Sequence, residues 1–124
     1  MTGNGELGPW PSELRLNPEK NILSITFTDG TAETLPAEFL RVHSPSAEVQ
    51  GHSPSERKLV PGKRNVTIKA IEPVGNYAVR LVFSDGHNTG IYSWAYLYEI
   101  GHNKVALWNS YLEELAGKGF SREG

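Results

Sequence analysis

The sequence predicts an α+β fold, with a mostly antiparallel sheet built from two ββα repeats and a C-terminal helix. Alternating apolar residues lead into an Asp-Gly pair at 29–30 and into a second Asp-Gly pair at 85–86. An Asp-Gly pair between alternating segments is typical of a β-hairpin. Residues 27–30, Phe-Thr-Asp-Gly, recur as residues 83–86, Phe-Ser-Asp-Gly, and an aromatic-Leu pair follows each turn. Two such units would pack their helices on antiparallel strands.

In the first repeat, we expect strands around residues 14–16, over 23–27 and over 31–35. Pro36 opens a short helical turn, because the fixed φ of proline suits a first helical position. Pro45 ends this turn, because the residue before a proline disfavours the α region.

Residues 44–62 show little apolar periodicity and contain three prolines and two glycines. This composition predicts an irregular loop. Loops of this length in a small domain are uncommon and are often functional or mobile. We therefore expect residues 44–62 to be the most mobile internal segment.

In the second repeat, alternation predicts strands over 66–70, 77–83 and 90–92. A helix follows over 94–100, and a last helix carries an apolar stripe at 105, 108, 112 and 115. The residues expected to begin or end these two helices are Ser93, Gly101, Asn103 and Gly117.

The length of 124 residues fits one domain with one core. We expect a flexible N-terminus over 1–10, a single domain over 11–116 and a flexible tail over 117–124. The net charge of −2 gives no basic field for nucleic acid. No apolar run is long enough to cross a bilayer, and the first ten residues do not resemble a signal peptide, so a cytoplasmic location is expected.

The chain has no cysteine. This excludes disulfides, thiolate metal sites, cysteine nucleophiles and cysteine-held iron–sulfur clusters. The Gly-x-Ser-x-Gly elbow of many hydrolases is missing, and Pro61-Gly62-Lys63-Arg64 lacks the spacing of a phosphate-binding P-loop. The sequence therefore favours a protein that is not an enzyme.

Three segments together resemble a known family. They are Leu40 to Ser46, the turn from Glu72 to Tyr77, and the run from Ser84-Asp85-Gly86-His87 to Tyr92-Ser93-Trp94. They resemble the domains similar to the N-terminal domain of gamma-butyrobetaine hydroxylase, over about residues 11–108. The resemblance implies a domain found in that oxygenase, attached to some P-loop iron–sulfur carriers, and as small stand-alone bacterial proteins. It implies no activity for the stand-alone form.

In the oxygenase, the resemblance implies a zinc ion held by three cysteines and one histidine. The matching positions in this chain are Ser44, Ser46, Val49 and His87. Serine is a poor zinc ligand and valine is none. The sequence thus looks like a zinc-binding fold that has lost its ligands, and we expect no metal and no cofactor.

An alternative metal site would use histidines only. His43 and His87 would lie near each other if the geometry of the family holds, and His52 could complete a three-histidine zinc site. The competing interpretation is that His43 ends a helical turn, His87 lies in a hairpin and His52 is solvated. No compact zinc-finger spacing decides between them.

Tyr92, Tyr96 and Tyr98 form the candidate partner surface. Residues two apart cannot all face one side of a helix, so some of these rings could be exposed as interface anchors. The alternative is that they are half buried with wet hydroxyls.

These observations favour a non-catalytic binding or accessory module for another protein. Iron–sulfur or redox cofactor metabolism is a setting that the family association suggests. The alternatives are a zinc-binding domain that uses histidines, and a small enzyme with a cryptic pocket converging on His43 and His87.

Overall fold

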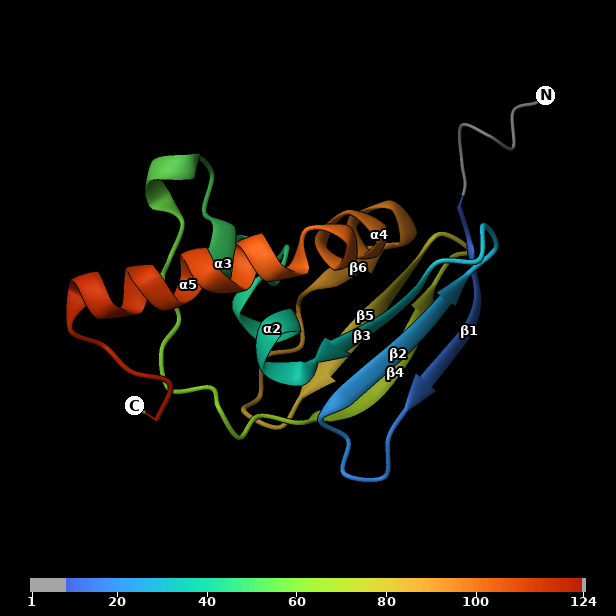
Figure 1. Cartoon of the computed structure of the whole chain (residues 1–124), viewed down its shortest axis with the longest axis horizontal. Helices are drawn as coiled ribbons and strands as arrows, with labels where there is room; N and C mark the ends of the chain where they lie inside the picture. Colours follow the sequence, from blue (N-terminus) through green and yellow to red (C-terminus); the bar gives the residue numbers. More distant parts are fainter. Residues whose placement is uncertain (1–8, 124) are drawn as a thin grey trace.

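A computed structural model describes residues 9–123 and shows an α+β fold with two antiparallel sheets and helices packed beside them (Figure 1). The first sheet has the order β1-β2-β3. Its strands are β1 (Pro11–Leu16), β2 (Ile22–Phe27) and β3 (Ala32–Pro36). The second sheet has the order β4-β5-β6. Its strands are β4 (Ile68–Val74), β5 (Ala78–Phe83) and β6 (Ile91–Ser93). The fold class and the antiparallel pairing predicted from the sequence are confirmed.

Both predicted hairpins are present and are built alike. In the first, the Phe27 N–H donates to Thr31 O, and Gly30 has φ +89°. In the second, the Phe83 N–H donates to His87 O, and Gly86 has φ +91°. Glycine adopts this left-handed region without the steric cost of a Cβ atom. The repeat in the sequence is therefore a repeat in structure.

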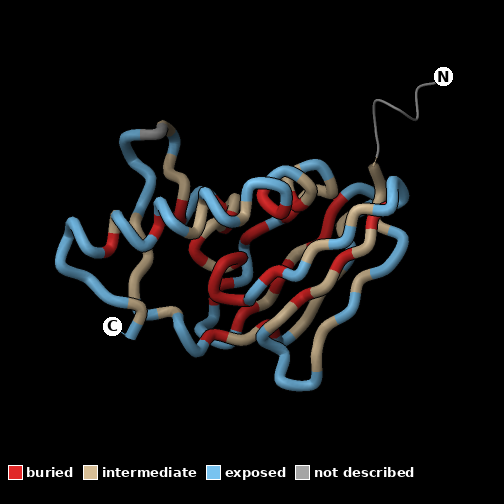
Figure 2. Tube along the Cα trace, viewed as in Figure 1, coloured by how far each residue is buried: buried red, intermediate tan, exposed pale blue. Residues whose placement is uncertain are grey.

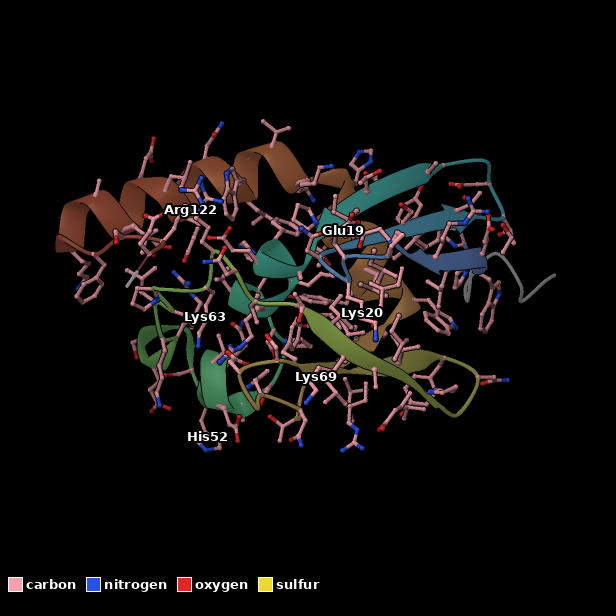
Figure 3. All side chains as sticks on the ribbon, turned by 90° about the horizontal axis from the view of Figure 1, so that it is seen from below. Glu19, Lys20, His52, Lys63, Lys69 and Arg122 are labelled. Atoms are coloured by element: carbon pink, nitrogen blue, oxygen red, sulfur yellow. The ribbon has the colours of Figure 1, made fainter. Side chains whose placement is uncertain are left out.

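Each repeat folds as a separate three-stranded sheet followed by a helix, whereas the sequence suggested one sheet. The two sheets overlap in the view of Figure 1 and lie next to each other in the perpendicular view of Figure 3. Buried and partly exposed residues alternate along β2 (Figure 2). The inward side chains of both sheets form one core with α2 and α4. Its strand residues include Leu23, Ile25, Phe27, Leu35, Ile68, Val79, Leu81 and Phe83.

Residues 9–123 also form helical segments after β3 and after β6. They are α2 (Ala37–Val42), α3 (Ala47–Gln50), the 3-10 turn η1 (Pro54–Glu56), α4 (Trp94–His102) and α5 (Lys104–Lys118). Pro36 precedes α2 and Ser93 caps α4, as predicted, and the Ser93 hydroxyl accepts a hydrogen bond from the Tyr96 N–H. No helix among residues 9–123 is both long and apolar enough to span a bilayer.

Three details of the sequence prediction are corrected. The segment 44–62 contains α3 and η1, because Ser46 caps α3 by accepting a hydrogen bond from the Glu48 N–H. Helix α4 continues through Gly101 to His102. Helix α5 ends at Lys118 and not at Gly117, and Gly119 caps it with a left-handed backbone at φ +72°.

The predicted flexible N-terminus lies mostly outside the described residues. Trp10 is described and exchanges hydrogen bonds with Thr28. At the other end, the carbonyl oxygens of Ser121 and Arg122 accept hydrogen bonds from the N–H groups of Gly62 and Arg64. Flexibility of the tail over 117–124 stays a prediction about motion.

Candidate functional site

The structure brings together the four positions at which the resemblance implies zinc ligands in the oxygenase. Ser44 is fully buried, and Ser46, Val49 and His87 are also buried. The Ser44 Oγ atom lies 2.8 Å from His87 Nε2. The Ser46 N–H donates to the same Oγ atom over 3.2 Å. Residues 44–49 and the β5–β6 turn are thus joined at the place where the resemblance implies a metal.

Further hydrogen bonds extend this contact into what we call the Ser44–His87 network. His87 Nδ1 lies 3.1 Å from Glu48 Oε1. Thr89 Oγ1 donates to the same carboxylate oxygen over 3.0 Å, and it lies 2.7 Å from Ser46 Oγ. The network connects two segments separated by about forty residues. A structural metal ion connects distant segments in the same way.

The protonation state of the network follows from its partners. Burial, and then the positive charge of Arg41, lower the pKa of His87 below 6.5. In the neutral ring one nitrogen donates and the other accepts. Because a carboxylate only accepts, Nδ1 carries the proton toward Glu48, and Nε2 accepts from the Ser44 hydroxyl.

The order Ser44–His87–Glu48 matches the hydrogen-bond order of a hydrolase triad. A triad also needs a nucleophile that a substrate can reach. Ser44 has no exposed surface. A Cβ atom on Gly90 would lie only 2.5 Å from Ser44 Oγ and 3.1 Å from a Tyr92 ring carbon, so this hydroxyl is closed in by neighbouring atoms. The network therefore fits a hydrogen-bonded connection between two segments, and the buried Ser44 hydroxyl does not fit the role of a nucleophile.

Asp85 lies beside the network and has two cationic partners. Its Oδ2 atom lies 2.8 Å from Arg41 Nε and 2.7 Å from Lys63 Nζ. Burial favours a higher pKa for this carboxyl, but the hydrogen bonds from Lys63, the His87 N–H and Arg41 outweigh it and lower the pKa to about 2. Asp85 is therefore ionised at neutral pH, and it fixes both cations.

The structure does not gather the three histidines of the zinc alternative. His43 Nδ1 lies 2.9 Å from Phe39 O, and burial lowers the pKa of its ring. His52 is exposed and points outward at the edge of the molecule (Figure 3). In the part of the chain that the structure describes, no three His, Cys, Asp or Glu side chains are placed to hold a metal ion. The three-histidine interpretation therefore has no geometric support.

The three tyrosines of the candidate partner surface occupy different environments. Tyr92 is fully buried, and its hydroxyl donates to Leu40 O, so it belongs to the core and not to a surface. Tyr96 and Tyr98 are half buried. Their hydroxyls donate to His43 O and to Asp29 Oδ2. Neither ring is free to act as a protruding anchor.

Exposed apolar residues occur along α5, where the sequence predicted an apolar stripe. Val105 is 71% exposed and Leu112 is 37% exposed, whereas Tyr111 and Leu115 are buried against Val42. The first and third positions of the apolar stripe at 105, 108, 112 and 115 are therefore exposed, because α5 turns Tyr111 and Leu115 toward the protein. Figure 2 shows exposed positions along much of this helix.

Val105 borders a groove of about 360 Å³, which we call the α2–α5 groove. Its apolar walls are Pro36, Phe39, Val105 and Trp108. Its charged residues are Glu38, Lys104 and Arg122. In the sequence, the apolar Val105 within a helical pattern was the only indication of this groove. A residue of the core gives the same pattern, so the groove could not be predicted from it.

A long-range ion pair beside this groove could not be seen in the sequence. Arg122 donates through Nη2 and Nε to the two carboxylate oxygens of Glu38, over 2.7 and 2.9 Å. The Glu38 side chain is only 6% exposed. The Arg122 guanidinium also lies 5.2 Å from the Trp108 ring. The tail is thereby attached to α2 and α5.

The fold and these sites define a small α+β domain in which buried hydrogen bonds join residues 44–49 to the β5–β6 turn. The sequence profile described as "Gamma-butyrobetaine hydroxylase-like, N-terminal" matches residues 14–98. The chain belongs to this family, as its motifs indicated. A comparison with curated proteins finds no match.

Solved structures support the same assignment. Two solution NMR structures of proteins are 47% and 49% identical to this chain, with TM-scores of 0.81 and 0.80. The matches cover 93% and 98% of this chain and 90% of each of those chains. A crystal structure of a protein of unknown function, of the DUF971 family from Acidithiobacillus ferrooxidans, is 38% identical with a TM-score of 0.62. That match covers 73% of this chain and 91% of that one.

Proposed function

We propose that this domain is a non-catalytic binding module that holds another protein through the α2–α5 groove. The observation that carries the proposal is a groove of about 360 Å³ with apolar walls beside a 71% exposed Val105. A pocket with apolar walls and a few polar groups is the usual form of a binding site. Exposed apolar patches rimmed by charged residues are typical of protein interaction sites.

The charges of the groove favour a partner segment that carries an apolar side chain next to a carboxylate. Glu38 and Arg122 neutralise each other. Lys104 donates to the neutral Thr34 O over 2.7 Å, and no ion pair to it occurs among residues 9–123. Its positive charge is therefore available to a partner's carboxylate. Complementary charge of this kind sets the orientation and the rate of association.

The setting of this binding is part of the proposal. We propose a cytoplasmic module that works without its own metal or cofactor, in iron–sulfur or redox cofactor metabolism. The support for that setting is the resemblance to domains attached to iron–sulfur carriers. The support for a role without catalysis is the closed environment of Ser44, the hydroxyl that would serve as nucleophile in the Ser44–His87 network.

Site-specific photo-crosslinking tests the proposal. A benzophenone amino acid is placed at Val105 in one protein and at Ile91 in a control, because Ile91 is also exposed but lies on β6. In the native cell, the probe at 105 should crosslink to one partner far more than the probe at 91. Val105→Asp, which places a negative charge beside the groove, should then weaken binding of that purified partner, whereas Ile91→Asp should not.

The crosslinked peptide of the partner is mapped by mass spectrometry. It should contain an apolar residue next to Asp or Glu, and Lys104→Gln should weaken its binding. Equal crosslinking from positions 105 and 91, or binding that Val105→Asp leaves unchanged, would rule out the groove as the contact surface.

A further inference from the structure

A second cavity, separate from the α2–α5 groove, collects positive charge. It measures about 390 Å³. Three cationic side chains line it: Arg41 from α2, and Lys58 and Lys63 from the segment that leads to β4. His87 and Glu48 of the Ser44–His87 network form another wall. Val49, Leu59, Val60 and Pro61 supply an apolar surface.

Arg41 has donors that form no hydrogen bond to any of residues 9–123. Among the hydrogen bonds of the described residues, it donates only through Nε, to Asp85. Its Nη1 atom is buried without a partner. Buried donors in native proteins are nearly always satisfied, so an unused one indicates a bound water, ion or other polar group. The free edge of a guanidinium fits the two oxygens of a phosphate or carboxylate.

The charge balance of the cavity also favours an anion. Asp85 offers one oxygen to both Arg41 and Lys63, so one negative charge serves two cations. Glu48 is engaged by His87 and Thr89. Lys58 forms no ion pair within residues 9–123. One positive charge is left over, together with the unused donors of Arg41.

We propose that this cavity binds the phosphate group of a small phosphorylated molecule. The free edge of Arg41 and the ammonium groups of Lys58 and Lys63 bind the phosphate oxygens. The volume exceeds that of a phosphate ion and lies in the range of small-molecule sites. The apolar surface around Leu59 and Val60 contacts the organic part of the ligand. This proposal is independent of partner binding at the α2–α5 groove.

Titrations of the full chain followed by amide NMR test the proposal, with inorganic phosphate and phenyl phosphate as probes. Both should give saturable shifts at residues 41, 58, 63 and 87. Phenyl phosphate should bind more tightly, because its ring reaches the apolar surface. Lys58→Gln should weaken phosphate binding about tenfold, the value of one hydrogen bond to a charged group. Lys58 is exposed, so this variant should keep the fold.

Lys69→Gln is the matched control. Lys69 is an exposed lysine on β4, and Figure 3 shows it apart from Lys63. The Lys69→Gln variant should bind phosphate as tightly as the unaltered protein. Arg41→Lys keeps the positive charge but loses the guanidinium edge that donates two hydrogen bonds. It should weaken phosphate binding more than Lys69→Gln does. The proposal is overturned if the shifts do not saturate, if they fall outside the cavity, or if Lys58→Gln and Lys69→Gln behave alike.

Discussion

The pair between Glu38 and Arg122 permits a quantitative test of how the C-terminal residues are attached. Arg122→Ala would leave the Glu38 carboxylate, which is 6% exposed, without its two hydrogen bonds. Removing one partner of a buried ion pair costs about 3–5 kcal/mol, because the other charge stays buried and unpaired. The Arg122 side chain is 32% exposed, so water screens the pair, and we expect the lower end, about 3 kcal/mol.

Arg64→Ala is the matched control. Arg64 pairs with Glu123 nearby in the structure, but the side chains of this pair are 52% and 59% exposed. Exposed pairs contribute at most about 1 kcal/mol. Urea unfolding followed by tryptophan fluorescence should therefore show a large loss of unfolding free energy for Arg122→Ala and a small loss for Arg64→Ala.

A second substitution separates charge from packing. Glu38→Gln in the Arg122→Ala background removes the unpaired charge, so it should restore part of the lost stability. Equal losses for Arg122→Ala and Arg64→Ala, or a further loss on adding Glu38→Gln, would refute the argument that a buried carboxylate depends on the tail. Such a result would instead favour the flexible tail over 117–124.

Three further predictions concern Gly90 beside the Ser44–His87 network, the buried rings of His43 and His87, and the effect of a chelator. Gly90→Ala should destabilise the fold, because its Cβ would lie 2.5 Å from Ser44 Oγ, whereas Gly117→Ala in α5 meets no atom within 4 Å and should stabilise it by about 0.5–1 kcal/mol; equal thermal shifts would contradict this. Burial lowers the folded-state pKa of His43 and His87 below 6.5, so the unfolded state binds more protons and the stability that these two rings contribute should be complete above pH 6.5 and fall as pH drops below it. Replacing both by Gln should flatten urea midpoints measured from pH 7.5 to 5, and an unchanged slope would count against it. The unfolding temperatures measured with and without a strong chelator should coincide, because hydrogen bonds connect the positions at which the resemblance implies zinc ligands in the oxygenase. A decrease of several degrees on adding the chelator would indicate a structural metal.

Much of the fold could be predicted because its signals are local. Asp29-Gly30 and Asp85-Gly86 each make a turn whose hydrogen bonds lie within a few residues. Ser93 caps α4 within three residues of itself. A positive φ and a capping hydroxyl depend on residue type and near neighbours, so the sequence reveals them.

The boundaries predicted less well depend on packing. Gly101 looks like the end of a helix but lies inside α4, where a Cβ atom would meet Glu33 side-chain carbon at 2.8 Å. Because Gly101 has no side chain, α4 can pack closely against β3 at this position. Val105 looks like a core residue but is exposed, because α5 places Tyr111 and Leu115 toward Val42. The periodicity of apolar residues predicts the helix, but it does not predict which face of the helix packs against the rest of the protein.

By itself the sequence determined the two hairpin repeats, the family and the absence of any thiolate chemistry, since each follows from residue types at short spacing. Only the tertiary structure decided which side chains meet in the Ser44–His87 network and where the α2–α5 groove and the cationic cavity lie. Ser44 and His87 are 43 residues apart, and Glu38 and Arg122 are 84 apart. Contacts at such separations exist only after the two sheets and α5 have packed, because folding, and not chain proximity, brings these side chains within hydrogen-bond distance.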